Sequence, residues 1–277
     1  MSFRWSLRMK TSCLPLWIFA ACVLSGLPAV AANNEPLAKG VQDNSFLIEE
    51  AYNQEAGVVQ HTATLRRQDR DWTFMFTQEW PMGSQAHQFS YSIPYSWLRI
   101  DDQRVRGVGD IMLNYRYQAL FESDVTPAFA PRLSLISPAG NRDKGTGEGS
   151  VGYEVMLPFS KIVSDRVTLH ANAAMTSYFN VDGHQPTSFR VGGSGIYAVT
   201  RDFNLMFETL AERNESVNVL REIERETSYT ISPGTRYAFN LREGQLVVGA
   251  AMPIRFTQSA TDFGAFLYLS FEHKFLK

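Results

Sequence analysis

The stretch FGAFLYLSFEHKFLK, from Phe263 to Lys277, closes the chain and decides its fold. Its residues alternate in character, as they do in a β-strand whose side chains point to opposite faces. One face carries Ala265, Leu267, Leu269, Phe271, His273 and Phe275, and the other carries Gly264, Phe266, Tyr268, Ser270, Glu272 and Lys274. Such a strand either closes a soluble β-sandwich or pairs with the first strand of an outer-membrane barrel.

The same alternation runs through the chain from Val58 onward, with no sustained helical period. Twelve segments cover residues 58–67, 72–80, 87–97, 109–121, 127–137, 151–162, 167–179, 188–200, 203–213, 228–239, 245–256 and the closing stretch. An even number suits a single-chain barrel with both ends on one side. We therefore predict an all-β fold, a transmembrane antiparallel β-barrel of about 12 strands with periplasmic N- and C-termini.

The connections between these segments alternate in length. Residues 81–86, 122–126, 163–166, 201–202 and 240–245 are short, whereas 98–106, 138–150, 180–186 and 214–227 are mostly longer and charged. Short periplasmic turns and long outer loops are typical of outer-membrane barrels. The first and last outer connections, residues 68–71 and 259–262, are short and break this pattern. Even so, a soluble sandwich has no reason to alternate in this way.

Aromatic residues on the apolar face also favour the barrel over the sandwich. They fall near the two strand ends: Trp72, Trp97, Phe179, Tyr229 and Phe256 at one, and Phe121, Phe159, Tyr197, Phe239 and Phe275 at the other. Two aromatic bands are the girdles that membrane interfaces favour.

The first 31 residues have the pattern of a secretory signal peptide. Arg4, Arg8 and Lys10 precede an apolar run, and small residues follow it, which predicts cleavage near Ala31 or Ala32 and export to the bacterial outer membrane. The expected organisation is a signal peptide over 1–31, a periplasmic lead-in over 32–57 and a barrel over 58–277. Both cysteines lie in the signal, and removing it leaves 23 basic and 28 acidic residues, a poor balance for binding nucleic acid.

Four stretches resemble a known family: GVGDIMLNYRYQAL from Gly107, RLSLISPAGNRDKGTGEGSVGYEVMLPFSK from Arg132, VTLHANAAMTS from Val167 and SPGTRYAFN from Ser232. They are similar to the outer-membrane proteins of the MetA-pathway of phenol degradation family. The likeness extends from about Gly107 to the C-terminus. It implies an outer-membrane transporter, and it brings no catalytic residues with it.

The polar face of the strands predicts the lining of the lumen. Its charged and ionisable members are candidates for a selectivity lining or for a purely structural network: Arg116, Arg132, Glu154, His170, Arg190, Glu208, Arg236, Arg255 and Glu272. We predict a passive channel or uptake protein for small solutes, aromatic ones included. The alternative from the same residues is a non-conducting structural barrel.

A lipid-modifying barrel enzyme is the third alternative. It would need a serine, a histidine and a polar partner on the lipid-facing side. His61 and His273 lie on the apolar face of the first and last strands, but Ser270 points inward. We therefore predict no catalytic residue, no metal site and no cofactor.

The last strand also predicts how the barrel assembles. Leu267, Leu269, Phe271 and Phe275 resemble the alternating, aromatic-ended assembly signal of outer-membrane barrels, followed by the overhang of Leu276 and Lys277. This strand is expected to pair with residues 58–67 and so to remove both sheet edges. The predicted partners are outer-membrane lipid, the barrel-assembly machinery and a small-molecule solute, and not nucleic acid.

Overall fold

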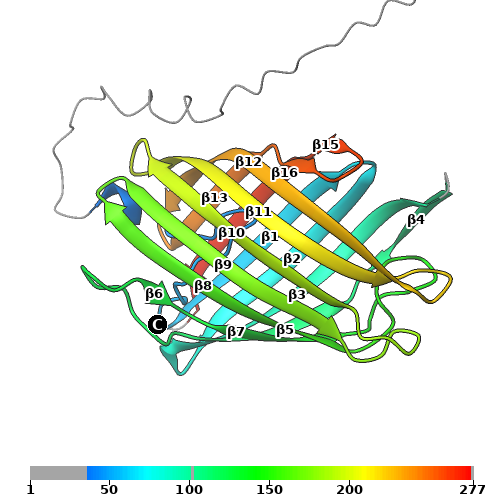
Figure 1. The fold of residues 1–277 in the computed structure, drawn as a ribbon. Helices are drawn as coiled ribbons and strands as arrows, with labels where there is room; N and C mark the ends of the chain where they lie inside the picture. Colours follow the sequence, from blue (N-terminus) through cyan, green and yellow to red (C-terminus); the bar gives the residue numbers. More distant parts are fainter. Residues whose placement is uncertain (1–35, 101–102, 276–277) are drawn as a thin grey trace, which may run out of the picture. The chain divides into compact units, whose positions relative to one another are not determined.

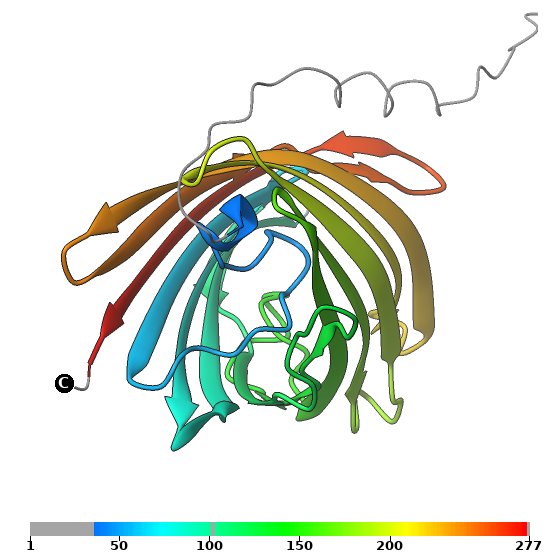
Figure 2. The same ribbon diagram turned by 90° about the vertical axis from the view of Figure 1, so that its left-hand side faces the viewer.

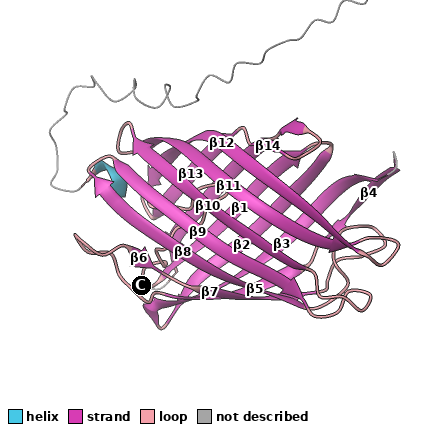
Figure 3. Ribbon diagram, in the orientation of Figure 1, coloured by secondary structure: helices cyan, strands magenta, loops and turns pink. Residues whose placement is uncertain are grey.

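The computed structural model describes residues 36–100 and 103–275, and these residues belong to one compact unit. The predicted signal peptide lies outside the described residues. β-Strands make up nearly all of the wall, and the single turn of 3-10 helix η1 (Leu37–Lys39) is the one helical element in the described part (Figure 3). No helix there is long and apolar enough to cross a membrane.

Sixteen strands tilt across the unit (Figure 1). Their bounds are β1 Val58–Gln68, β2 Asp71–Met82, β3 Ser84–Ile100, β4 Gln103–Val108, β5 Ile111–Tyr117, β6 Ala128–Phe129, β7 Arg132–Ser137, β8 Gly152–Ser164, β9 Val167–Tyr178, β10 Thr187–Ala198, β11 Phe203–Val217, β12 Ile223–Leu241, β13 Gly244–Ala251, β14 Ile254–Phe256, β15 Thr261–Phe263 and β16 Ala265–Lys274.

The strands form a closed antiparallel barrel whose wall is twelve strands wide, as the sequence predicts. Four wall strands are each split in two: β4 with β5, β6 with β7, β13 with β14, and β15 with β16. Pro131 and Pro253 stand at two of these interruptions, because a proline cannot donate a hydrogen bond to the ladder. Closure is made by β1 and β16, with Val58 opposite Lys274 and Arg67 opposite Ala265.

The two faces of the wall differ as expected for a barrel in a membrane. On β9, for example, Leu169 is 45% exposed on the outside, whereas its neighbour His170 is only 5% exposed on the inside. The predicted aromatic bands lie on the outer surface, and Trp72, Trp97, Phe179, Tyr229, Phe121, Phe159, Phe239 and Phe275 are among the exposed members. An apolar outer surface with polar side chains inside is the arrangement that hydrocarbon requires.

Two of the predicted long connections are in fact strand. Residues 98–106 are largely the hairpin of β3 and β4, and residues 214–227 are largely the extended ends of β11 and β12. The ladder continues because residues of these stretches find partners opposite, such as Asn214 with Glu226. The end of β16 lies at the end of the barrel away from the paired ends of β3 and β4 (Figure 1).

The long connection between β7 and β8 bends inward instead of standing out in solvent. Asp110 fixes it, because its carboxylate accepts from the backbone N–H of Gly140 at 2.9 Å and of Glu148 at 2.8 Å. Gly145 sits beside the inward-facing Leu98 and Ile100. This loop therefore narrows the mouth of the barrel opposite the C-terminus.

Candidate functional site in the barrel lumen

The lumen is occupied by residues 41–54, which we call the plug segment (Figure 2). These residues belong to the predicted lead-in over 32–57, and from residue 41 they run along the inner wall. The segment forms no regular secondary structure. Since each wall strand already pairs with two neighbours, the N–H and C=O groups of the plug must find partners among side chains.

Side-chain oxygens of the wall accept the N–H groups of the plug. Glu208 accepts from Leu47 at 2.7 Å and from Ile48 at 3.1 Å. Further acceptors are Asn172 for Glu49 (2.7 Å), Ser160 for Ala51 (2.6 Å), Gln118 for Asn53 (2.9 Å) and Gln88 for Gln54 (2.7 Å). These hydrogen bonds pair the buried backbone N–H groups of the plug, as a neighbouring strand would in a sheet.

Two buried arginines supply most of the donors for the plug's carbonyl groups, and we call them the plug clamps. Arg236 on β12 donates to the carbonyls of Val41 (3.0 Å), Asp43 (2.6 Å) and Asn44 (2.8 Å). Arg116 on β5 donates to the carbonyls of Glu50 (3.1 Å) and Tyr52 (2.7 Å) and to Oδ1 of Asn53 (2.8 Å). A guanidinium suits this task because it presents several donors in one plane.

An apolar socket holds the first half of the plug. Phe46 stacks on Phe266 and lies against Tyr268, each ring centroid 5.3 Å away. Gly249 makes room for it, since a Cβ there would lie 2.5 Å from Phe46 Cζ. Gly192 makes room for Ile48 in the same way, since a Cβ there would lie 2.5 Å from Ile48 Cδ1. The plug therefore packs as well as hydrogen-bonds.

Asp43 links the plug to the strands that close the barrel. Its Oδ1 atom accepts from the Tyr268 hydroxyl at 2.5 Å and from Gln60 Nε2 at 2.8 Å, and Gln60 also donates to Ser270. Burial raises the pKa of the Asp43 carboxyl above its usual range, although nearby Arg236 and these hydrogen bonds act in the opposite direction.

Glu50 is a second buried carboxyl of the plug. Its side chain is buried, and burial raises its pKa to about 8. The acidic Asp43 and Glu79 add to this rise, whereas Arg116 and Arg236 oppose it. At neutral pH the packed plug therefore holds Glu50 largely as the neutral acid.

This raised pKa predicts that the plug loosens at alkaline pH. A packed carboxyl with a pKa above its usual 4.5 binds more protons than a solvated one, so the packed state loses stability as pH rises from 4.5 to about 8. We expect channel opening in planar bilayers to increase over this window, by up to about tenfold per pH unit.

The control for this pH dependence is a pair of glutamine variants. Glu50→Gln should weaken the pH dependence of opening and leave the part that Asp43 contributes, whereas Glu55→Gln, at an exposed position of the same stretch, should behave like the unmodified protein. An unchanged pH profile in Glu50→Gln would show that another group titrates.

Nearer the opposite mouth, Glu154 of β8 forms ion pairs with arginines of β7 and β10. It pairs with Arg132 at 2.6 Å and Arg190 at 2.9 Å, and it accepts from Thr176 at 2.8 Å. Arg132 also contacts Glu49, at the edge of the plug. Cation and anion thus alternate around this part of the lumen, and their charges largely cancel.

The structure separates the nine lumen candidates into distinct groups. Arg116, Arg236 and Glu208 bind the plug, and Arg132, Glu154 and Arg190 form the network beside it. The Ser160 hydroxyl oxygen, which accepts the N–H of Ala51 in the plug, also lies 2.7 Å from Nδ1 of His170. Arg255 pairs with Glu226, and Glu272 lies opposite Gln60 and Gln245. Their part in solute selection stays a prediction.

The alternating pattern of the strands does not reveal the plug. The plug segment shows no alternation of apolar and polar residues, because its hydrogen-bond partners come from many strands. One signal is present in the sequence, however: Ile196, Met206 and Phe266 are apolar yet occupy inward-facing positions. Apolar residues on the polar face of a barrel indicate that something apolar is held inside.

The outer-surface histidines lie as predicted. His61 and His273 stack with ring centroids 5.5 Å apart where β1 meets β16. Ser270 is buried inside the wall and accepts from Gln60. These positions do not bring a serine to the two histidines. Among the described residues no group of three or more His, Cys, Asp or Glu is placed to hold a metal ion.

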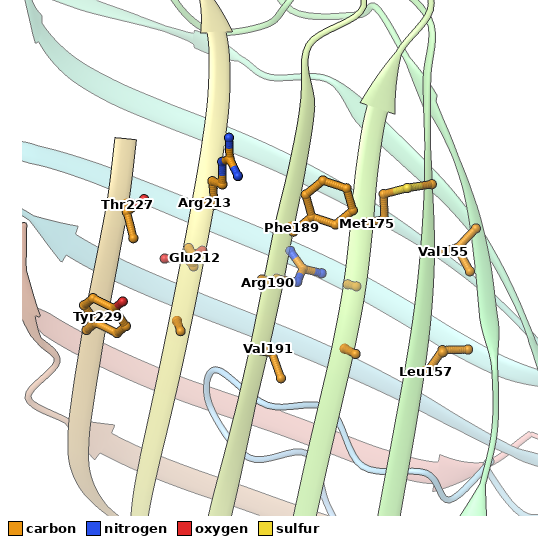
Figure 4. Close-up of a pocket in the computed structure, with 13 residues that line it drawn as sticks. Val155, Leu157, Met175, Phe189, Arg190, Val191, Glu212, Arg213, Thr227 and Tyr229 are labelled. Carbon is orange, nitrogen blue, oxygen red and sulfur yellow. The ribbon is translucent and has the colours of Figure 1, made fainter. Parts of the chain in front are cut away.

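A shallow apolar groove of about 630 Å³ runs over the outer surface of β8 to β12. Val155, Leu157, Met175, Phe189, Val191 and Tyr229 border it, and Arg190 and Glu212 lie behind the wall (Figure 4). The small side chains of Ala173 and Ala211 create the depression. Its lining is what a wall facing hydrocarbon needs, so it requires no ligand.

Comparison with known proteins agrees with this architecture. Residues 43–271 match the model of a family described as "Putative MetA-pathway of phenol degradation". The match begins inside the plug segment and ends in the last strand. A search of curated protein sequences found no match.

Two solved structures are similar to this chain to different degrees. The COG4313 outer membrane channel from Pseudomonas putida F1 is 12% identical, with a TM-score of 0.63 over 84% of this chain and 99% of that one. The KdgM porin is 13% identical, with a TM-score of 0.47 over 78% of this chain and 99% of that one. The first likeness supports the barrel fold.

Proposed function

Because the chain belongs to the MetA-pathway of phenol degradation family, we propose that it is a passive uptake channel for small solutes, aromatic ones included. One observation carries the proposal. The barrel is closed and polar inside, and its obstruction is a segment of its own chain, bound mainly through hydrogen bonds to side chains. Because the plug takes no part in the strand ladder, it can leave and return without opening the wall.

Orientation follows from the same proposal. We place the C-terminus and the plug entrance in the periplasm and the β3–β4 tip outside, as the short and long connections favour. Removal of the signal near Ala31 or Ala32 would leave only about ten residues before the plug segment. Insertion would depend on the barrel-assembly machinery reading the last strand.

The lumen charges support passage of small solutes over large charged ones. Glu154, Arg132 and Arg190 lie beside the plug with their charges paired. Glu49 leaves with the plug, so a solute that passes this point meets one carboxylate between two guanidinium groups, which suits a small polar or aromatic molecule, anionic ones included. In this proposal the plug sets whether the channel is open, and the ring around Glu154 sets what passes.

The test is transport by the purified full-length mature protein. In planar bilayers we expect brief openings of small conductance, and in proteoliposomes we expect phenol to enter faster than a trisaccharide. Silent insertion with no uptake would contradict the proposal and leave a structural barrel. Hydrolysis of phospholipid in the same vesicles would instead favour the lipid-modifying enzyme.

A further inference from the structure

A second cavity, of about 880 Å³, lies on the outside of the barrel at the end away from the C-terminus. We call it the rim pocket. It is formed by the turn after β1, the start of β2 and the β3–β4 hairpin, whose tip stands at that end (Figure 1). Its main side chains are Arg70, Trp72, Trp97, Arg99, Arg104 and Arg106.

The strand register gathers these side chains on the lipid-facing surface. Trp72 is opposite Trp97, and Trp97 is opposite Arg106. Arg99 is directly opposite Arg104. Arg104 and Arg106 are two residues apart on β4 and so lie on the same outer face of the hairpin.

Asp69 and Asp71 are the described acidic residues on either side of Arg70. The Asp71 carboxylate accepts from the backbone N–H of Arg99 at 2.7 Å. Asp69 stands in the turn after β1 and donates its N–H to Asp262. Neither Arg104 nor Arg106 forms an ion pair with a described residue, and both are exposed. The two exposed guanidinium groups of Arg104 and Arg106 therefore face outward.

The two tryptophans indicate where the guanidinium groups lie relative to the membrane. Trp72 is 38% exposed and Trp97 is 42% exposed on the outer wall, beside Leu65, which also lines the pocket. Indole rings settle at the boundary between hydrocarbon and head groups. The arginines therefore stand at head-group level, where a basic pocket binds anionic lipid.

We propose that the rim pocket binds a phosphate of lipid A, the phosphorylated glycolipid of the outer leaflet. Arg104 and Arg106 would hold the phosphate oxygens through paired N–H donors, and an acyl chain would lie on Trp72 and Leu65. This inference rests on the proposed function for its orientation alone, which places the β3–β4 tip in the outer leaflet. The pocket opens on the outer wall and not into the lumen, which favours a lipid over a passing solute.

Tryptophan fluorescence provides the assay, because three of the five tryptophans lie beyond residue 31 and two of those are in the pocket. The full mature protein in detergent would be titrated with bisphosphorylated lipid A. We expect a saturable change, and we expect Arg104→Gln with Arg106→Gln to weaken binding about 30-fold. Arg213→Gln, at another exposed outward-facing arginine, should bind as the unmodified protein does.

Three results would overturn the inference. They are equal binding by the double variant, equal binding of phosphatidylglycerol, and reproduction of the signal by inorganic phosphate at the same concentration. Heat-modifiable migration of each variant on a detergent gel shows that the barrel is folded. A protein that conducts but does not bind lipid A refutes this inference and leaves the proposed function intact.

Discussion

Replacement of both plug clamps, Arg116→Met with Arg236→Met, is expected to turn a mostly closed barrel into a mostly open one. The two guanidinium groups donate to six acceptors of the plug, five of them backbone carbonyls. A hydrogen bond to a charged group contributes about 1.5–3 kcal/mol. Loss of even about 3 kcal/mol would raise the open population about 100-fold, which single-channel recording would detect as long openings.

Methionine is chosen because it keeps the length and apolar contacts of the arginine stem. The control is Arg255→Met, which removes a lumen arginine that pairs with Glu226 and not with the plug. It should leave the open population unchanged. If the double variant folds, as heat-modifiable migration would show, and yet opens no more often than the control, the clamps do not hold the plug in place.

Deletion of residues 275–277 is expected to abolish the assembled barrel. Phe275 is the last described residue; it is exposed on the outer wall, and its backbone N–H donates to the carbonyl of Gly57 at 2.9 Å. The strand it ends, β16, pairs with both β1 and β13 and so closes the sheet. An unclosed barrel leaves two bare edges, and these cannot be tolerated in hydrocarbon.

The measurement is the amount of heat-modifiable, protease-resistant protein in the outer-membrane fraction. Deletion of residues 276–277 alone serves as the control, because it keeps Phe275 and should assemble. Normal assembly of the longer deletion would show that the aromatic end of β16 is not needed, and would remove the role assigned to Leu267, Leu269, Phe271 and Phe275.

Alternation in the sequence is sufficient to predict the wall. A period of two residues assigns each side chain to one face, so the pattern alone places Leu267 outside and Ser270 inside, where both lie. The pairing of β16 with β1 follows because a barrel must close. Splits such as the one at Pro253 do not disturb this pattern, since the two halves continue one wall strand.

The plug cannot be predicted in the same way. The alternation predicts Arg116, Glu208 and Arg236 as lumen-facing charges, without any partner from the lead-in. The partners of the two arginines lie 63 to 195 residues away in the chain, and most are backbone groups, which carry no sequence signature. The apolar residues Ile196 and Phe266 at inward-facing positions are the available sign that the lumen is filled.

The most direct test locks the plug in place and measures the current. Ser45 of the plug and Ser194 of β10 have their hydroxyl oxygens 2.6 Å apart, and Cys13 and Cys22, the chain's cysteines, both lie in the predicted signal. Ser45→Cys with Ser194→Cys should therefore form a disulfide during export. We expect no openings in planar bilayers while the disulfide is intact and openings like those of the unmodified protein after reduction. The same current before and after reduction would contradict a channel that opens by moving its plug.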